Sequence, residues 1–137
     1  MDAVVETCSH AGGDLCALEA VPERVCFNFG TERRQYRTIS LRNTGARRLA
    51  IKIRTTSRNA IKVDVTYRFL DPGCTTVVRV VRLPLSNSWR ANSMDRISFY
   101  YVTTDYSEEF AINAYKKEEF FKREIVKVVY RSDDAGC

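Results

Sequence analysis

The stretch Ile51–Gly73, IKIRTTSRNAIKVDVTYRFLDPG, decides the fold class of this chain. Around its start, Leu49, Ile51 and Ile53 alternate with Lys52 and Arg54, as a strand with one buried face requires. A second run repeats the alternation and predicts one core face from Ile61, Val63, Val65, Tyr67 and Phe69. The tripeptide Asp71-Pro72-Gly73 then predicts a turn, because proline presets φ and glycine accepts a positive φ. The stretch therefore predicts two strands and a turn.

Short strand-like runs recur over the rest of the chain, with turn signals between them. Six further runs have the length and composition of strands: residues 15–20, 24–29, 36–43, 75–83, 95–102 and 123–131. Eight such runs without alternating helices indicate an all-β protein, an antiparallel β-sandwich. We expect a flexible tail over residues 1–14, one sandwich domain over 15–131 and a C-terminal tail over 132–137.

Two of these runs, VVRVVRL and IVKVVY, are apolar on both faces. That pattern is typical either of central strands or of strands that form a contact surface. Their candidate association residues are Val77, Val78, Val80, Val81, Ile125, Val126, Val128 and Val129.

One segment, residues 105–121, breaks the strand pattern. Asp105 or Ser107 is placed to cap a short helix, and Phe110 and Ala114 have the i, i+4 spacing of one helical face. The sequence predicts a loop here with a turn or two of helix.

Composition limits the class of protein. The chain has 137 residues, 45% hydrophobic and 28% charged, with a net charge of +5, as in an ordinary soluble domain. The N-terminus is a poor secretory signal, so we expect an intracellular, cytoplasmic protein. The five cysteines, an odd number with no Cys-x-x-Cys spacing, argue against a disulfide framework and a zinc site; Cys26 is expected in the core.

Catalytic chemistry finds little support. His10, in the expected tail, is the only histidine, and neither a glycine-rich phosphate loop nor a pair of carboxylates is present. We therefore expect no enzyme activity, no cofactor and no metal. The chain also lacks a strand with the spaced aromatic residues of RNA-binding modules, so nucleic acid is not an expected partner.

The strongest candidate site lies within the opening stretch. Lys52 and Arg54 share the outward face of one strand, and Thr55 and Thr56 add hydroxyl groups at its end. This combination suits carboxylates or phosphates, since arginine offers a planar fork and lysine a mobile charge. The alternative is a charged sheet face that only keeps the protein soluble.

Four short motifs, in order and spacing, resemble the major sperm protein (MSP) domain family. They are Leu41-Arg42-Asn43, Arg54-Thr55-Thr56, Leu70-Asp71-Pro72 and Asp95-Arg96-Ile97, within a match over about residues 15–130. VTYRF and REIVKVVY are most similar to the small sperm-specific members, and more distantly the chain resembles the receptor domain of the VAMP-associated proteins. The resemblance implies an immunoglobulin-like sandwich of seven strands without catalysis.

The resemblance also implies protein partners. Sperm-specific members build or accompany filaments that move amoeboid sperm, whereas the receptor domain binds acidic Phe-Phe motifs. The receptor's peptide-binding positions correspond to Lys52, Arg54, Thr55, Thr56 and Arg96. We favour an accessory or structural protein of the sperm cytoskeleton, with self-association and without membrane insertion; a soluble adaptor for acidic Phe-Phe motifs is the alternative.

Two departures from the family pattern bear on these expectations. Val65 stands where the family has a proline before the Leu-Asp-Pro turn, so the bend there is missing or formed differently. Ser98 replaces a hydrophobic residue of the receptor's site, which weakens the expectation of peptide binding.

Overall fold

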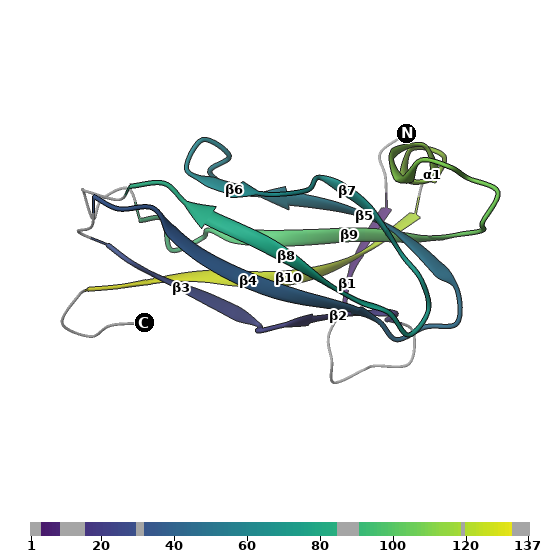
Figure 1. Cartoon of the computed structure of the whole chain (residues 1–137), viewed down its shortest axis with the longest axis horizontal. Coiled ribbons are helices and arrows are strands. Elements are labelled where there is room, and N and C mark those ends of the chain that lie inside the picture. The colour runs from purple at the N-terminus through teal and green to yellow at the C-terminus, as the bar shows by residue number, and fades with distance from the viewer. Residues whose placement is uncertain (1–3, 9–15, 30–31, 85–90, 119, 133–137) are drawn as a thin grey trace.

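A computed structural model describes residues 4–8, 16–29, 32–84, 91–118 and 120–132, which form two facing β-sheets (Figure 1). The six-stranded sheet contains β1 (Val4–Thr7), β10 (Phe120–Arg131), β9 (Arg96–Thr104), β5 (Arg48–Thr55) and β7 (Tyr67–Leu70) in that order, with β3 (Arg24–Asn28) also paired to β10. The four-stranded sheet has the order β2 (Leu18–Val21), β4 (Gln35–Asn43), β8 (Thr75–Arg82) and β6 (Ile61–Val63). The predicted β-sandwich is confirmed.

The core lies between the inward faces of the two sheets. Leu49, Ile51 and Ile53 are buried there, as their alternation predicts, whereas Arg54 is exposed. The largest fully buried side chains, contributed by both sheets, include Phe27, Phe99, Ile39, Leu41, Ile97 and Val78. Burial of this apolar surface is the main favourable term for the fold.

The run 61–69 is not one strand, and this prediction is wrong. The chain leaves β6 at Asp64, crosses between the sheets at Val65 and continues as β7. Because the bend inserts residues outside both ladders, the alternation changes face. Ile61 lies in the core, but Tyr67 is opposite Lys52 on the outward face of the other sheet.

Hydrogen bonds form the bend that proline forms elsewhere in the family pattern. The Asp64 N–H donates to the Arg79 carbonyl at 3.2 Å, and the Asp64 carboxylate accepts from the Arg79 N–H at 3.0 Å. On the opposite sheet, the Ile53 N–H donates to the Thr66 carbonyl at 2.8 Å. The bend is therefore present without a proline at Val65.

The predicted turn at Asp71-Pro72-Gly73 is confirmed. Gly73 has φ +75°, and the Cys74 N–H donates to the Asp71 carbonyl at 3.0 Å. Asn43 is buried against this turn; its amide nitrogen donates to the carbonyls of Leu70 at 2.9 Å and Arg47 at 2.8 Å. Asn43 thereby ties the end of β4 to the turn after β7.

The N-terminal segment differs from its prediction. Val4–Thr7 form β1, parallel to β10, so the expected flexible tail is wrong for these residues. Most of the remaining residues of both expected tails lie outside the described residues, and the boundaries at 15 and 131 stay a prediction.

The prediction that argued against disulfide bonds is also wrong. Cys8 and Cys16 form a disulfide, Cys26 is disulfide-bonded as well, and Cys74 is free and exposed. Ordering the four residues of β1 costs about 1–2 kcal/mol each, which a few backbone hydrogen bonds of roughly 1 kcal/mol each offset only in part. Closing the loop between Cys8 and Cys16, 8 residues apart, contributes about 2–3 kcal/mol more.

The segment 105–121 contains one short helix, α1 (Ala111–Lys116), after a loop, as predicted. The predicted caps are wrong: Phe110 holds the N-cap position without a side-chain hydrogen bond, and Asp105 instead bonds Ser107 within the loop. Ala114 packs α1 onto the outward face of the six-stranded sheet, near Phe121.

Strands β8 and β10 are interior strands of their sheets, so the central-strand alternative is confirmed. Four of the eight candidate association residues, Val78, Val80, Val126 and Val128, lie in the core. The other four, Val77, Val81, Ile125 and Val129, occupy outward positions. Strand β4 pairs one whole edge of β8, whereas β6 pairs the other edge only over Val80–Arg82. Strand β10 is paired on one edge by β9 over Lys122–Lys127 and on the other by β1 and β3. Edge pairing with another chain is closed at these paired residues only. Association through their outward residues stays a prediction.

Replacing Ile51 with alanine should lower the free energy of unfolding by about 2–5 kcal/mol, because it leaves a cavity between the sheets. Val77→Ala, on the outward face of β8, is the matched control and should cost less than about 1 kcal/mol. Urea unfolding followed by circular dichroism measures both. Equal losses for the two variants would contradict the placement of Ile51.

Candidate protein-interaction face

Six cationic residues gather on the outward face of the six-stranded sheet; we call them the basic face. They are Lys52 and Arg54 on β5, Arg96 on β9, Arg123 and Lys127 on β10, and Arg24 on β3. Strand register brings them together: Lys127 lies between Arg24 and Arg96 in one row across three strands. In the neighbouring rows Arg54 is opposite Ser98, and Lys52 and Arg123 flank Tyr100.

The basic face carries an uncompensated charge. Neighbouring side chains in adjacent strands lie about 5 Å apart, so like charges there repel one another. Among the residues that the structure describes, none of the six cations forms an ion pair. The arrangement therefore costs stability that an anionic partner would restore.

Aromatic rings hold the Lys52 ammonium at one end of the basic face. Its nitrogen lies 5.6 Å from the centre of the Tyr67 ring and 5.5 Å from that of Tyr115, which α1 contributes. Burial raises the pKa of Tyr115 to about 12, so this phenol is neutral at physiological pH and acts as a π-surface. Tyr115 also packs on Phe121, with ring centres 4.4 Å apart. Helix α1 thus forms a wall beside Lys52.

Thr55 and Thr56, predicted as hydrogen-bond donors for a partner, are used inside the domain. The Thr55 hydroxyl donates to the Ile61 carbonyl at 3.0 Å. The Thr56 hydroxyl donates to the Asp95 carboxylate at 2.9 Å and accepts from the Arg96 N–H at 2.8 Å. These two side chains position the ends of β5 and β9 and have few hydrogen-bonding groups left for a ligand.

Asp95 is the centre of this polar network and is only 2% exposed. Besides Thr56, its carboxylate accepts from the hydroxyls of Ser57 at 2.7 Å and Tyr130 at 2.6 Å. The Tyr130 oxygen in turn accepts from Arg82 Nε at 3.2 Å. Burial, with the hydrogen bond to Asp95, raises the pKa of Tyr130 to about 12, so its phenol keeps the proton that it donates.

The sequence-predicted site is therefore divided in two. Lys52, Arg54 and Arg96 lie on one face, and their role in binding stays a prediction. Ser98, opposite Arg54, is buried and adds no hydrophobic contact for a partner. Sequence reasoning missed Arg24, Arg123 and Lys127. The spacing of Arg123, Ile125 and Lys127, each two residues apart, was a usable signal, because it places all three on one face of a strand. It also missed Tyr67 and Tyr115, for which the sequence carried no signal.

In the described part of the chain, no group of three or more His, Cys, Asp or Glu side chains is placed to hold a metal ion. The single helix in the described ranges is also too short to cross a membrane.

A family model of the MSP (major sperm protein) domain matches residues 17–121, well over half of the chain. No curated protein sequence matches.

Solved structures with the same fold include two Caenorhabditis elegans proteins. One is WR4, an MSP family member, which is 18% identical with a TM-score of 0.60, and the other is SSP-19, an MSP-domain protein, which is 17% identical with a TM-score of 0.64. In each case the alignment covers 80% of this chain and 97% of the other. A PapD-like domain of human CEP192 is 9% identical with a TM-score of 0.54, covering 85% of this chain and 84% of that one. At these identities the likeness establishes the fold.

Asp95→Ala should lower the free energy of unfolding by about 3 kcal/mol, because it leaves the hydroxyls of Thr56, Ser57 and Tyr130 without their acceptor. Asp105→Ala removes a carboxylate in an exposed loop and should cost less than about 1 kcal/mol. Denaturant unfolding of both variants gives the comparison. A stable Asp95→Ala protein would show that the network is dispensable.

Proposed function

Because the chain belongs to the MSP domain family, we propose that it is a non-enzymatic protein-interaction domain that binds acidic segments of protein partners through its basic face. The observation that carries this proposal is the row of cations across β3, β10 and β9, extended by Arg54 and Lys52 on β5.

The chemistry of the basic face fits an extended acidic segment. Arginine side chains bind carboxylates with two parallel hydrogen bonds, and three of the six cations here are spaced at successive strands. Tyr100, between Lys52 and Arg123, and Tyr115 at the rim offer ring surface to an aromatic partner residue. A segment that combines acidic residues with phenylalanine, such as an acidic Phe-Phe motif, satisfies both features.

For the cellular role, we favour an accessory or structural component of the MSP-based sperm cytoskeleton, acting in the cytoplasm. The family match and the likeness to two C. elegans family members support this assignment. A soluble adaptor that recruits proteins with acidic Phe-Phe motifs is the second candidate, and the basic face favours it. In both roles the contact surface is the same.

A charge reversal tests the proposed surface. Arg54→Glu should weaken binding of an acidic Phe-Phe peptide at least about tenfold from a micromolar Kd, roughly −8 kcal/mol in the wild type. Binding to the wild type should also weaken as salt rises, because the exposed charges are screened. Arg42→Glu, exposed on the opposite sheet, is the control and should bind normally.

The two cellular roles separate in a second experiment. Co-sedimentation with MSP filaments that is lost in Arg54→Glu and kept in Arg42→Glu would support the cytoskeletal role. Peptide binding without any filament association would favour the adaptor. If neither peptide nor filaments bind, or if both charge reversals act equally, the basic face is not the contact surface.

A further inference from the structure

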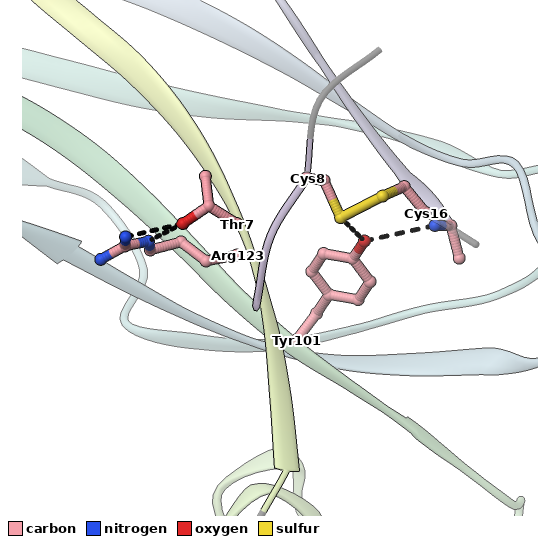
Figure 2. The surroundings of a disulfide bond; sticks show 6 residues. Thr7, Cys8, Cys16, Tyr101 and Arg123 are labelled. Atoms are coloured by element: carbon pink, nitrogen blue, oxygen red, sulfur yellow. Dashed lines mark hydrogen bonds between the residues drawn. A yellow bond between two sulfur atoms is a disulfide. The ribbon is translucent and has the colours of Figure 1, made fainter. Parts of the chain in front are cut away.

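A disulfide fastens the end of the first strand to a segment that leads into the other sheet. Cys8 directly follows β1, and its bond to Cys16 joins β1 to the segment that leads into β2 (Figure 2). The Tyr101 hydroxyl lies 3.0 Å from Cys8 Sγ and accepts from the Ala17 N–H at 3.3 Å. Since Tyr101 is buried in the core, its contact with Cys8 packs the disulfide against the core of the domain.

The strand β1 is short and exposed. It has four residues, and Val4 and Val5 are 56% and 40% exposed. Its described contacts besides the disulfide include the parallel ladder with β10, the Cys8 N–H to the Arg123 carbonyl at 2.8 Å, and the Arg123 guanidinium to the Thr7 hydroxyl at 2.7 Å (Figure 2). Such a short, exposed strand is among the elements of a domain that open most easily.

The strand β1 covers a backbone edge suited to strand addition. Beneath it, β10 presents Phe120 and Phe121 followed by Lys122 and Arg123. Beside this edge is a cavity of about 220 Å³ lined by Ala17, Tyr101, Val102, Thr103, Glu118, Phe120 and Lys122. An extended segment with two apolar residues followed by an acidic residue complements this edge, because the two phenylalanines are apolar and Lys122 and Arg123 are cationic.

We propose that the Cys8–Cys16 disulfide is a redox-controlled latch: its reduction releases β1, and the freed edge of β10 then binds an extended partner segment of the pattern apolar, apolar, acidic. In the reduction, a dithiol donates two electrons and two protons; the Cys8–Cys16 bond breaks, two thiols form, and the dithiol becomes a disulfide. Both cysteines are partly exposed, so a reductant reaches them.

The inference can be tested apart from the proposed function, because strand addition uses the backbone edge of Phe120–Arg123, and of these residues Arg123 alone belongs to the basic face. The redox chemistry of the cell also bears on the latch. Disulfides in the cytosol of most organisms are transient or regulatory, since the glutathione and thioredoxin systems reduce them. In this respect the latch rests on the proposed cytoplasmic role, in which it would change state with the redox systems of the cell.

Amide hydrogen exchange of the full chain tests the release of β1. Reduction with dithiothreitol, or Cys8→Ser with Cys16→Ser, should speed exchange over residues 120–123 about tenfold and leave residues 49–53 of β5 unchanged. Cys74→Ser is the matched control and should match the wild type, and Cys26→Ser reports on the other bonded cysteine. Unchanged exchange over 120–123 in both the reduced protein and the double variant would overturn the latch.

The freed edge is tested with a peptide of the sequence DAVVET, residues 2–7, added to isotope-labelled protein. Because released β1 stays tethered at a millimolar effective concentration, we expect binding to the reduced protein in the millimolar range and none to the oxidised protein. Backbone NMR shifts should move at 120–123 and not at Arg54. Equal binding to oxidised and reduced protein, or a peptide with both valines changed to aspartate that binds as well, would overturn the proposed partner. Self-association of the reduced protein without peptide binding would do the same, because a second copy would then be the occupant.

Discussion

The buried carboxylate of Asp95 is the constraint on which the candidate interaction surface depends. A charge in a protein interior is tolerated only when hydrogen-bond donors surround it, and here the hydroxyls of Thr56, Ser57 and Tyr130 do so. Those three donors come from the end of β5, the turn after it and β10. The carboxylate therefore holds the two strands beside β9 in place, and Arg54 and Arg96 come to lie on one face. Thr56, which the family resemblance places among the partner-binding residues, instead helps to position this surface through its hydrogen bond to Asp95.

The basic face results from register. Its cations come from four strands, far apart in sequence, and each strand alone has only an ordinary alternation of charged and apolar residues. Pairing of β3, β10, β9 and β5 places like charges side by side, where they repel. In a domain that acts only through contact with other proteins, this cost in stability is offset when an acidic partner binds, because the partner relieves the repulsion between the cations. Helix α1 adds the Tyr115 ring at one end and limits how a partner approaches Lys52.

The two ends of the six-stranded sheet are built differently. Around Asp95, a hydrogen-bonded network buries its charge and locks the strands together. Around β1, a short strand is held by a few hydrogen bonds and one covalent bond that a change of redox state can break. A sandwich with one locked end and one releasable edge offers two kinds of contact for partners, one electrostatic and one based on backbone pairing, with Arg123 at the point where they meet.

The sequence by itself determined the sandwich, most strand positions, the turn at Asp71-Pro72-Gly73 and the loop with a short helix, because alternation, turn residues and helical spacing act over a few residues. It also indicated Lys52, Arg54 and Arg96, through a resemblance to the MSP domain. Only the tertiary structure decided that Tyr67 faces outward, since a bend of three residues at Val65 changes the face of the strand. It also assigned Thr55 and Thr56 to internal hydrogen bonds, added Arg24, Arg123 and Lys127 to the basic face, and joined Cys8 to Cys16. Each of these depends on which distant residues become neighbours, and local patterns carry no information about that.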